Sequence, residues 1–264
     1  GRCGPERALP IPMKICILIK QIAPFSGRDF HGRGVGGTEA ALVVLAEDFA
    51  RLGHSITVAN TLPAQVMERG VLYCGQEDVR GASFDLLLLV RDWAPVAESI
   101  AATAKLLFLT DVDQADRPSL PTALAWARSV LLMSRFQEGR LLRILGNPFA
   151  RLPRTVIGLP INVEDYGEFA ELREPLLLYC SVPSRGLEHL SRILPAIRRR
   201  VPNARLVITS DKTLWGKPSR RGIYEPALSR IGGVEYLGAV SRPELVALQK
   251  RARVQVYPCH FMEG

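Results

Sequence analysis

The chain has 264 residues, enough for two compact domains, and 47% of them are apolar, as in globular proteins. No apolar run reaches membrane-spanning length, and the first twelve residues, with Arg2, Glu6, Arg7 and three prolines, do not have the pattern of a signal peptide. The five cysteines are scattered without metal-ligand spacing, which indicates reduced thiols. We therefore expect a disordered leader over residues 1–12 and a cytoplasmic protein.

The net charge of +8 is concentrated in the second half of the chain. Residues 1–166 contain 18 Lys and Arg and 17 Asp and Glu, whereas residues 167–264 contain 16 and 9. An excess of positive charge favours an anionic partner: a nucleotide, a phosphate, nucleic acid or an acidic membrane surface. Part of the excess, Arg198-Arg199-Arg200, ends a predicted helix, where cations are favourable beside the helix dipole.

A Gly-Gly loop precedes the first long predicted helix. Strands are predicted at Lys14–Ile19 and Ser55–Asn60, and between them Gly36 and Gly37 lead into a helix predicted over Thr38–Leu52. The glycines allow the backbone to approach a ligand, and the first helical turn favours an anionic or hydroxyl-rich one. They lie too far after the strand for the glycine turn of a nicotinamide-binding fold, and Asn60 stands where its ribose-binding acid is expected. We expect no dinucleotide cofactor.

The rest of the first half alternates between strand-like and helix-like segments. Further strands are predicted at Val71–Cys74, Leu86–Val90, Leu106–Thr110, Ser129–Met133 and Thr155–Leu159. Helices are predicted at Val96–Ala104, Leu120–Ala127 and Arg135–Leu145. Continuously apolar strands indicate a parallel sheet covered on both faces, so residues 13–166 are predicted to form a doubly wound domain. The acidic segment Glu164–Pro175 is predicted to be a hinge.

The same pattern starts again after the hinge. Strands are predicted at Leu176–Cys180, Leu206–Thr209, Val234–Leu237 and Val254–Tyr257. Helices are predicted at Leu187–Arg200, Ile223–Ile231 and Pro243–Ala252. We therefore predict an α/β protein of two Rossmann-like, doubly wound domains that face each other across a cleft, with residues 167–264 as the second domain.

Two polar side chains of the second half follow predicted strands. Arg185 lies between a strand and a helix, where its guanidinium and the helix amides could bind one anion. Glu263 follows the last strand, where its carboxylate could accept hydrogen bonds from sugar hydroxyls. Taken singly, Arg185 is also compatible with a solvated surface arginine, and Glu263 with an ordinary loop glutamate.

Several short motifs follow one another along the chain. They are Gly36-Gly37-Thr38-Glu39, Ser134-Arg135-Phe136-Gln137, Val156–Asn162 with Tyr166, Ser184-Arg185-Gly186-Leu187, Val234–Gly238 with Glu244-Leu245, and Pro258–Gly264. In this order and spacing, from Met13 to the last residue, they resemble the retaining glycosyltransferases of the GT-B type, in particular the family-four group (glycosyl transferases group 1).

The resemblance implies an acceptor-side first domain and a second domain that binds a nucleotide-sugar. Arg185 stands at the family's phosphate-binding lysine position, and Glu263 at its sugar-contacting glutamate. Gly238 and Val240 fall where the family's backbone meets the base. The resemblance also places Gly36 and Gly37 against the donor diphosphate and sugar.

The implied reaction transfers a hexose from a nucleoside-diphosphate sugar to an acceptor hydroxyl with retention of configuration. No cofactor besides the donor is expected. The expected acceptor is a carbohydrate, a lipid-linked molecule or a small molecule. We also expect peripheral contact with the inner face of a membrane, and no nucleic acid partner.

The chain departs from the family at two site positions. Ser181 replaces an arginine that often follows the first strand of the second domain, so phosphate binding would depend on Arg185, helped by Lys212 or Lys217. Thr110 replaces a sugar-contacting histidine, which leaves Asp111 as the candidate at that place.

Asp111-Val112-Asp113 also has the spacing of the metal-binding motif of GT-A glycosyltransferases, in which paired carboxylates bind Mg²⁺ or Mn²⁺. A GT-A enzyme would not have a second basic, doubly wound domain after residue 175. We therefore predict an acidic loop here and no metal site.

Two other functions remain open from the sequence. A sugar-nucleotide epimerase on the same architecture would bind the same donor but need no acceptor. A non-catalytic basic module would bind nucleic acid or an anionic membrane, although few aromatic residues lie among the basic residues of 185–221. Because the last motif would continue past Gly264, we also expect the second domain to be incomplete and this chain, by itself, to transfer little sugar.

Overall fold

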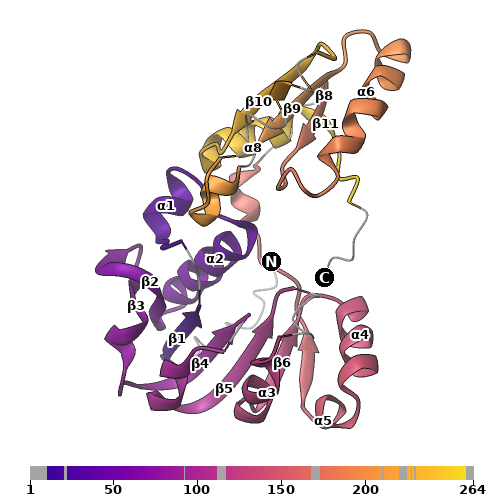
Figure 1. The fold of residues 1–264 in the computed structure, drawn as a ribbon. Helices are drawn as coiled ribbons and strands as arrows, with labels where there is room; N and C mark the ends of the chain where they lie inside the picture. The colour runs from indigo at the N-terminus through magenta and orange to yellow at the C-terminus, as the bar shows by residue number, and fades with distance from the viewer. Residues whose placement is uncertain are drawn as a thin grey trace, which may run out of the picture. The chain divides into compact units, whose positions relative to one another are not determined.

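The structure is a computed structural model that describes residues 11–20, 23–91, 93–111, 117–167, 173–209, 211–219, 225–226, 228 and 230–259. Predictions that fall outside these residues concern most of the leader, Val112-Asp113, part of the hinge, part of the helix at 223–231, and Glu263. The chain divides into two compact units (Figure 1). Unit 1 comprises Gly1–Gly27, Ala41–Pro160 and Gly264, and unit 2 comprises Arg28–Ala40 and Ile161–Glu263.

Unit 1 contains a seven-stranded sheet in the order β3-β2-β1-β4-β5-β6-β7. The strands are β1 (Lys14–Ile19), β2 (Ser55–Glu68), β3 (Val71–Gly75), β4 (Ser83–Val90), β5 (Ala101–Leu109), β6 (Ser129–Leu132) and β7 (Arg154–Val156). Their order is that of a Rossmann-like sheet, and the parallel pairing of β1 with both β2 and β4 confirms the predicted doubly wound class.

The apolar strands of unit 1 are buried because both faces of the sheet are covered. Ile15–Ile19 of β1 are at most 3% exposed, so side chains pointing to either face are shielded from water. Leu87 and Leu89 pack in one core with residues of α3 (Leu120–Trp126), α4 (Arg135–Leu145) and α5 (Asn147–Ala150). The long helix α2 (Gly37–Arg51) follows the short α1 (Gly27–His31), and both helices cross the boundary between the units.

The strand predicted at Thr155–Leu159 is shorter, β7 at Arg154–Val156, and two other predictions for unit 1 are wrong. The predicted helix Val96–Ala104 is instead a 3-10 turn at Pro95–Ser99 followed by β5, because Ala101–Ala104 pair with β4 and this pairing overrides the helix propensity of alanine. Strand β2 does not end at Asn60 but continues to Glu68. There Arg69 and Gly70, both with positive φ, form a turn that returns the chain to β3, as in a tight hairpin.

Unit 2 contains a four-stranded parallel sheet in the order β10-β9-β8-β11. Its strands are β8 (Glu174–Tyr179), β9 (Arg205–Thr209), β10 (Val234–Gly238) and β11 (Ala252–Gln255). The last strand starts two residues before the predicted Val254–Tyr257, because Ala252 both ends the preceding helix and pairs with Glu174 of β8.

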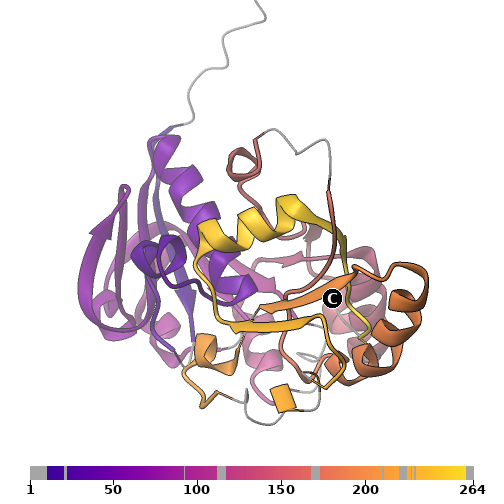
Figure 2. The ribbon, with the colours of Figure 1, turned by 90° about the horizontal axis from the view of Figure 1, so that it is seen from above.

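Two helices cover opposite faces of the unit 2 sheet (Figure 2). Leu177 and Tyr179 of β8 pack with leucines of α6 (Leu187–Arg200), whereas Leu176 and Leu178 point the other way and pack near Leu248 of α8 (Arg242–Arg251). This arrangement confirms the second Rossmann-like sheet. Among the described residues, no helix combines the length and the apolarity needed to cross a bilayer.

Candidate functional site

The strand order of unit 2 reverses between β8 and β11, and this reversal locates the candidate site. In open α/β sheets, ligands bind at the carboxyl ends of the two strands at such a switch point. The loop Cys180–Gly186 follows β8, and the segment Val256–Cys259 follows β11. Both therefore lie at the edge of the sheet where a ligand is expected.

Arg185 connects these two segments. Its Nη1 lies 3.4 Å from the hydroxyl oxygen of Tyr257. The hydroxyl of buried Tyr179 lies beneath the loop, 2.7 Å from the carbonyl oxygen of Val182 and 3.1 Å from that of Arg185. Burial, followed by the neighbouring Tyr257 and Glu188, raises the pKa of Tyr179, so this phenol stays a hydrogen-bond donor. The Tyr179 hydroxyl thus holds the backbone of the loop that carries Arg185 in place.

Gly186 lets the two segments come into close contact. It has φ +88°, a conformation that favours glycine, and a Cβ built on it would overlap the carbonyl oxygen of Pro258. Helix α6 starts at the next residue, Leu187, whose amide donates to the carbonyl oxygen of Pro183 at 3.3 Å. Because this first-turn amide is engaged, an anion at the loop would depend more on the guanidinium and the helix dipole than the sequence suggested.

The carboxyl ends of β9 and β10 lie at the same edge of the sheet. Gly238 ends β10 with φ +76° and has open space on its Cβ side, so the backbone there is accessible. After β9, buried Asp211 accepts hydrogen bonds from the amide of Thr213 and the hydroxyl of Ser219. These bonds hold the 3-10 turn Lys212–Trp215.

The Gly-Gly loop packs on this edge within unit 2. A Cβ built on Gly34 would lie 2.6 Å from the carbonyl oxygen of Val240, and one on Gly36 would lie 2.7 Å from the indole nitrogen of Trp215. At both positions a residue with a Cβ would require Val240 or Trp215 to move, whereas glycine does not. The structure therefore brings Gly36 close to the carboxyl ends of β9 and β10.

Arg242 connects helix α8 to the segments that flank the Gly-Gly loop in the structure. Its Nε and Nη2 donate to Asp165 Oδ2 at 3.1 and 3.0 Å. Its guanidinium also lies over the rings of Phe30, at 5.5 Å, and Tyr166, at 5.8 Å. Stacking and a paired carboxylate together fix an arginine in one orientation. Through the contact with Phe30, the segment that leads to the glycines packs against the start of α8.

Asp111 belongs to unit 1, where it follows β5. Its Oδ2 lies 3.2 Å from Nε of Arg91, the residue that follows β4, and the same Nε donates to Thr110 Oγ1 at 3.1 Å. Arg91 has φ +68°, which is unusual for a residue other than glycine and typical of functional loops. Thr110, which stands where the resemblance expects a sugar-contacting histidine, here accepts a hydrogen bond from Arg91.

The predicted site residues separate into three groups. Ser181, Arg185, Gly238 and Val240 lie at the carboxyl ends of unit 2 strands, and Gly36 and Gly37 belong to the loop of the same unit. Asp111 lies at the corresponding edge of the unit 1 sheet, and Glu263 lies outside the described residues. Sequence reasoning missed Tyr257, Trp215, Arg242 and Arg91. For Arg91 and Tyr257 the local signal was a cation or an aromatic within two residues of the end of a strand, whereas Trp215 and Arg242 lie farther from β9 and β10 and had no such signal.

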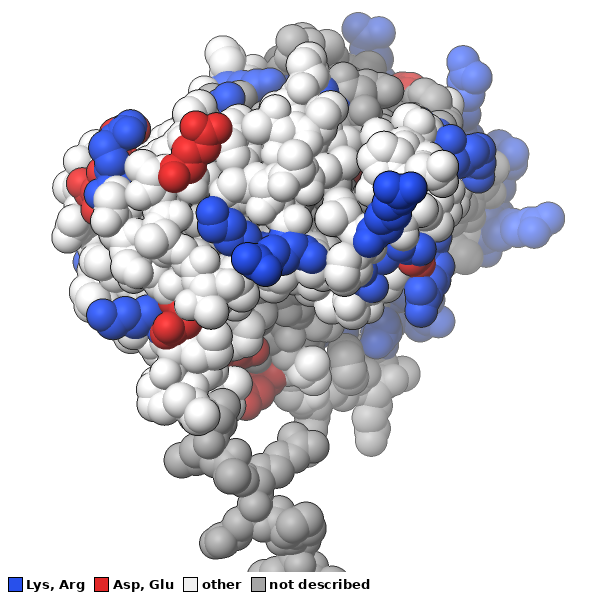
Figure 3. Space-filling view, turned by 90° about the horizontal axis from the view of Figure 1, so that it is seen from below, with Lys and Arg blue, Asp and Glu red and all other residues white. Residues whose placement is uncertain are grey.

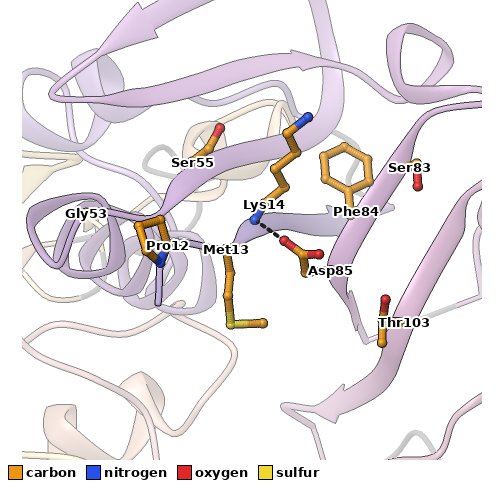
Figure 4. Close-up of a pocket in the computed structure, with 9 residues that line it drawn as sticks. All are labelled: Pro12, Met13, Lys14, Gly53, Ser55, Ser83, Phe84, Asp85 and Thr103. Atoms are coloured by element: carbon orange, nitrogen blue, oxygen red, sulfur yellow. Dashed lines mark hydrogen bonds between the residues drawn. The ribbon is translucent and has the colours of Figure 1, made fainter. Parts of the chain in front are cut away.

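A pocket of about 540 Å³ in unit 1 is at the wrong edge for such a site (Figure 4). Its lining includes Lys14, Ser55 and Ser83, which begin β1, β2 and β4, and the amide of Lys14 donates to Asp85 Oδ2 at 2.7 Å. Ligands of this fold class bind at the opposite, carboxyl ends of the strands. No group of three or more His, Cys, Asp or Glu among the described residues is arranged to hold a metal ion.

Solved structures with the same architecture are found over nearly the whole chain. Sucrose-phosphate synthase from Thermosynechococcus elongatus matches with a TM-score of 0.68 and 16% identity, over 95% of this chain and 77% of that one. The catalytic domain of starch synthase IV from Arabidopsis thaliana, bound to ADP and acarbose, matches with a TM-score of 0.60 and 13% identity, over 95% and 79%.

The protein HepE from Anabaena, in complex with UDP-glucose, matches with a TM-score of 0.61 and 13% identity, over 93% of this chain and 73% of that one. The chain has the GT-B fold. No protein-family model and no curated protein sequence matches the chain. Identities this low show that the GT-B fold is shared. They do not show that the chemistry of the site is shared.

Proposed function

We propose that this chain is a glycosyltransferase that moves a hexose from a nucleoside-diphosphate sugar to an acceptor hydroxyl with retention of configuration. The observation that supports this most is the position of Arg185. It lies at the switch point of the basic unit, between Tyr257 and the start of α6, where a diphosphate is favoured by the guanidinium and the helix dipole. The GT-B fold provides the two sheets that such an enzyme needs.

In this proposal the donor binds along the carboxyl edge of the unit 2 sheet. Arg185 binds the diphosphate, with Ser181 in the same loop. The backbone at Gly238 and Val240 contacts the base, and Gly36 and Gly37 contact the diphosphate and sugar. Glu263 accepts hydrogen bonds from the sugar hydroxyls.

The chemistry requires stabilisation of charge more than a protein base. The bond from the anomeric carbon to the diphosphate oxygen breaks, and the same carbon forms a bond to the acceptor oxygen. The acceptor proton passes to the leaving diphosphate. Fixed cations and dipoles, here Arg185 and the start of α6, lower the energy of the leaving diphosphate. Asp111, oriented by Arg91, is the candidate to hydrogen-bond to sugar hydroxyls in place of the missing histidine.

The expected partners follow from this reaction. The donor is a nucleoside-diphosphate sugar, and uridine and adenine nucleotides are the first to test, because HepE was solved with UDP-glucose and starch synthase IV with ADP. The acceptor is a carbohydrate, a lipid-linked molecule or a small molecule. We also propose a cytoplasmic location with peripheral contact to an anionic membrane.

A donor screen tests this function. The protein is incubated with UDP-glucose, ADP-glucose or GDP-mannose, with and without a set of sugar acceptors, and nucleoside diphosphate release is measured. We expect slow, acceptor-dependent release with one donor, in keeping with the little transfer expected of this chain, and a product whose anomeric configuration matches that of the donor. Conversion of the donor into an epimer without acceptor would favour the epimerase instead. Absence of both release and nucleotide binding would contradict any donor-dependent enzyme.

A further inference from the structure

A row of polar side chains lines the pocket at the amino ends of the unit 1 strands (Figure 4). The parallel register aligns Ser55 of β2 with Lys14 of β1, and Lys14 with Asp85 of β4. It also aligns Asp85 with Thr103 of β5. Aligned residues of neighbouring strands point to the same face of a sheet, and neighbouring strands lie about 4.8 Å apart. These four side chains, the polar row, therefore extend along one face for about 14 Å.

The polar row lies where the cover of this face of the sheet ends. Two residues farther along β1 and β4, Cys16 and Leu87 point to the same face, are 0% exposed and belong to the core that includes residues of α3, α4 and α5. Lys14 and Asp85, in contrast, are exposed. The hollow left at this edge has a volume of about 540 Å³. This volume falls within the range of about 300–1,000 Å³ that is typical of ligand pockets.

The side chains of the polar row are available to a ligand. Lys14 and Asp85 have opposite charges on adjacent strands, an arrangement that favours an ion pair. Instead, Asp85 Oδ2 accepts from the backbone amide of Lys14 at 2.7 Å, while the Lys14 side chain extends away from the carboxylate (Figure 4). Within the described parts of the chain, the Lys14 ammonium and the hydroxyls of Ser55, Ser83 and Thr103 have no hydrogen-bond partner. These groups can therefore bind a ligand without breaking a contact of the fold.

The chemistry of the lining matches that of a sugar. A hydroxyl both donates and accepts, an ammonium donates and a carboxylate accepts, so the polar row complements a ligand whose groups do both. Sugar hydroxyls have this property. The half-buried ring of Phe84, which also lines the pocket, offers apolar surface to the C–H groups of a sugar ring.

The charges around the pocket favour a neutral ligand. The lining contains one cation, Lys14, and one anion, Asp85. Figure 3, seen from below, shows acidic and basic side chains separated by uncharged surface toward the left, the side on which Figure 1 draws β1 and β2. Basic side chains gather toward the right instead. A surface without a field of one sign does not attract a strongly anionic ligand such as a nucleotide.

We propose that this pocket binds a short, neutral oligosaccharide through the polar row, with a sugar ring against Phe84. It is a second sugar site, because Asp111 and the proposed acceptor side lie at the opposite, carboxyl edge of the same sheet. The proposal does not depend on the transfer activity, since nothing in this binding involves the donor. Failure of the proposed enzyme activity and failure of this site are therefore separate results.

A titration followed by nuclear magnetic resonance tests this inference. Maltotriose, cellotriose and chitotriose are added separately to the ¹⁵N-labelled full chain, and the shifts of the backbone amides are followed. We expect at least one trisaccharide to shift the amides of Lys14, Ser55 and Ser83 in a saturable way. Shifts confined to residues near Asp111 would show binding at the acceptor side only and would overturn the proposal.

Variants of the polar row test which groups make the contact. Ser55→Ala/Thr103→Val removes two hydroxyls and should bind the trisaccharide roughly tenfold more weakly, since each hydrogen bond contributes a few-fold to affinity. Asp85→Asn keeps an oxygen for the Lys14 amide but removes the charged acceptor, and should also bind more weakly.

The chain offers a matched control for the loss of the two hydroxyls. Thr61 and Thr155 are exposed on β2 and β7 of unit 1 and do not line the pocket. Thr61→Val/Thr155→Val removes the same number of exposed strand hydroxyls and should bind as the unchanged protein does. Circular dichroism and melting temperature confirm that each variant is folded.

Three results would overturn the proposal. The first is the absence of shifts in the pocket lining with all three trisaccharides. The second is equal affinity of Ser55→Ala/Thr103→Val and the control variant. The third is tighter binding of the zwitterion glycylglycine than of any trisaccharide, because the Lys14 and Asp85 charges would then recognise opposite charges and not sugar hydroxyls.

Discussion

Gly186 and Pro258 are in such close contact that a side-chain carbon on Gly186 would overlap the carbonyl oxygen of Pro258. Gly186→Ala must therefore displace the segment after β11 or the loop that carries Arg185. It must also adopt φ near +88°, which costs an alanine about 1–2 kcal/mol. We predict that the free energy of unfolding, measured with urea, falls by more than about 2 kcal/mol.

Gly53 provides the control for this prediction. It has φ +90°, but a Cβ built there meets nothing within 4 Å. Gly53→Ala therefore has the backbone cost without the overlap and should lose less stability than Gly186→Ala. Equal losses in the two variants would mean that the contact with Pro258 contributes nothing.

Arg91 gives a test of backbone strain next to Asp111. Its φ of +68° penalises every residue with a Cβ, so Arg91→Gly should be more stable than Arg91→Ala by about 1 kcal/mol, although both lose the contacts with Thr110 and Asp111. At Arg80, with φ −59°, the order should reverse, because alanine is favoured over glycine at ordinary angles. Urea unfolding of the four variants measures both differences. If Arg91→Ala proved more stable than Arg91→Gly, position 91 would not be strained.

Glu174 connects three elements of unit 2 through arginines. It accepts from Arg205 at 2.8 Å and from Arg251 at 2.6 and 3.2 Å, and the hydrogen bond from Arg251 is the main cause that holds its pKa below the usual 4.5. A carboxylate with a lowered pKa stabilises the fold above its unfolded pKa, and this contribution is lost as the pH falls through the folded pKa. The melting temperature of Glu174→Gln should therefore be lower than that of the unchanged protein at pH 7. The two should converge below pH 4.5, and a constant difference down to pH 3 would exclude the carboxylate as the cause.

Removal of metal ions should leave donor turnover unchanged. Asp111 already has the Arg91 guanidinium 3.2 Å from its Oδ2, and a divalent cation would have to compete with that positive charge. Nucleoside diphosphate release from the active donor should be the same before and after EDTA treatment. A loss that Mn²⁺ restores would show that the Asp111 loop or the donor diphosphate binds a metal.

Most of the strands and the doubly wound class of the two sheets followed from the sequence because the signals are local. Continuous apolar runs such as Ile15–Ile19 must be covered on both faces, and the alternation with amphipathic helices leaves few other arrangements. Arg185 was found for the same reason, since a cation in the loop between a strand and a helix is visible without knowledge of the fold. The helix predicted over Arg135–Leu145 is confirmed with the same bounds, and its start is equally local because Ser134 caps it.

The errors and omissions depend on contacts between distant residues. The alanines at 101–104 form a strand only because β4 lies beside them, and β2 extends to Glu68 only because it can turn back along β3. Tyr257 lies 72 residues from its partner Arg185, and Trp215 is far along the chain from Gly36. No periodicity in one sequence reports which loops meet at the edge of a sheet.

Calorimetric titration of the protein with UDP, ADP and the corresponding nucleosides tests the central claim most directly. If Arg185 binds the donor diphosphate, Arg185→Ala should weaken binding of the preferred diphosphate by about 1.5–3 kcal/mol, the size of a hydrogen bond to a charged group. Affinity for the nucleoside should not change. Arg192 is an exposed arginine on helix α6, which follows the loop of Arg185, and Arg192→Ala should bind both as the unchanged protein does. An unchanged diphosphate affinity in Arg185→Ala would contradict the proposed donor site.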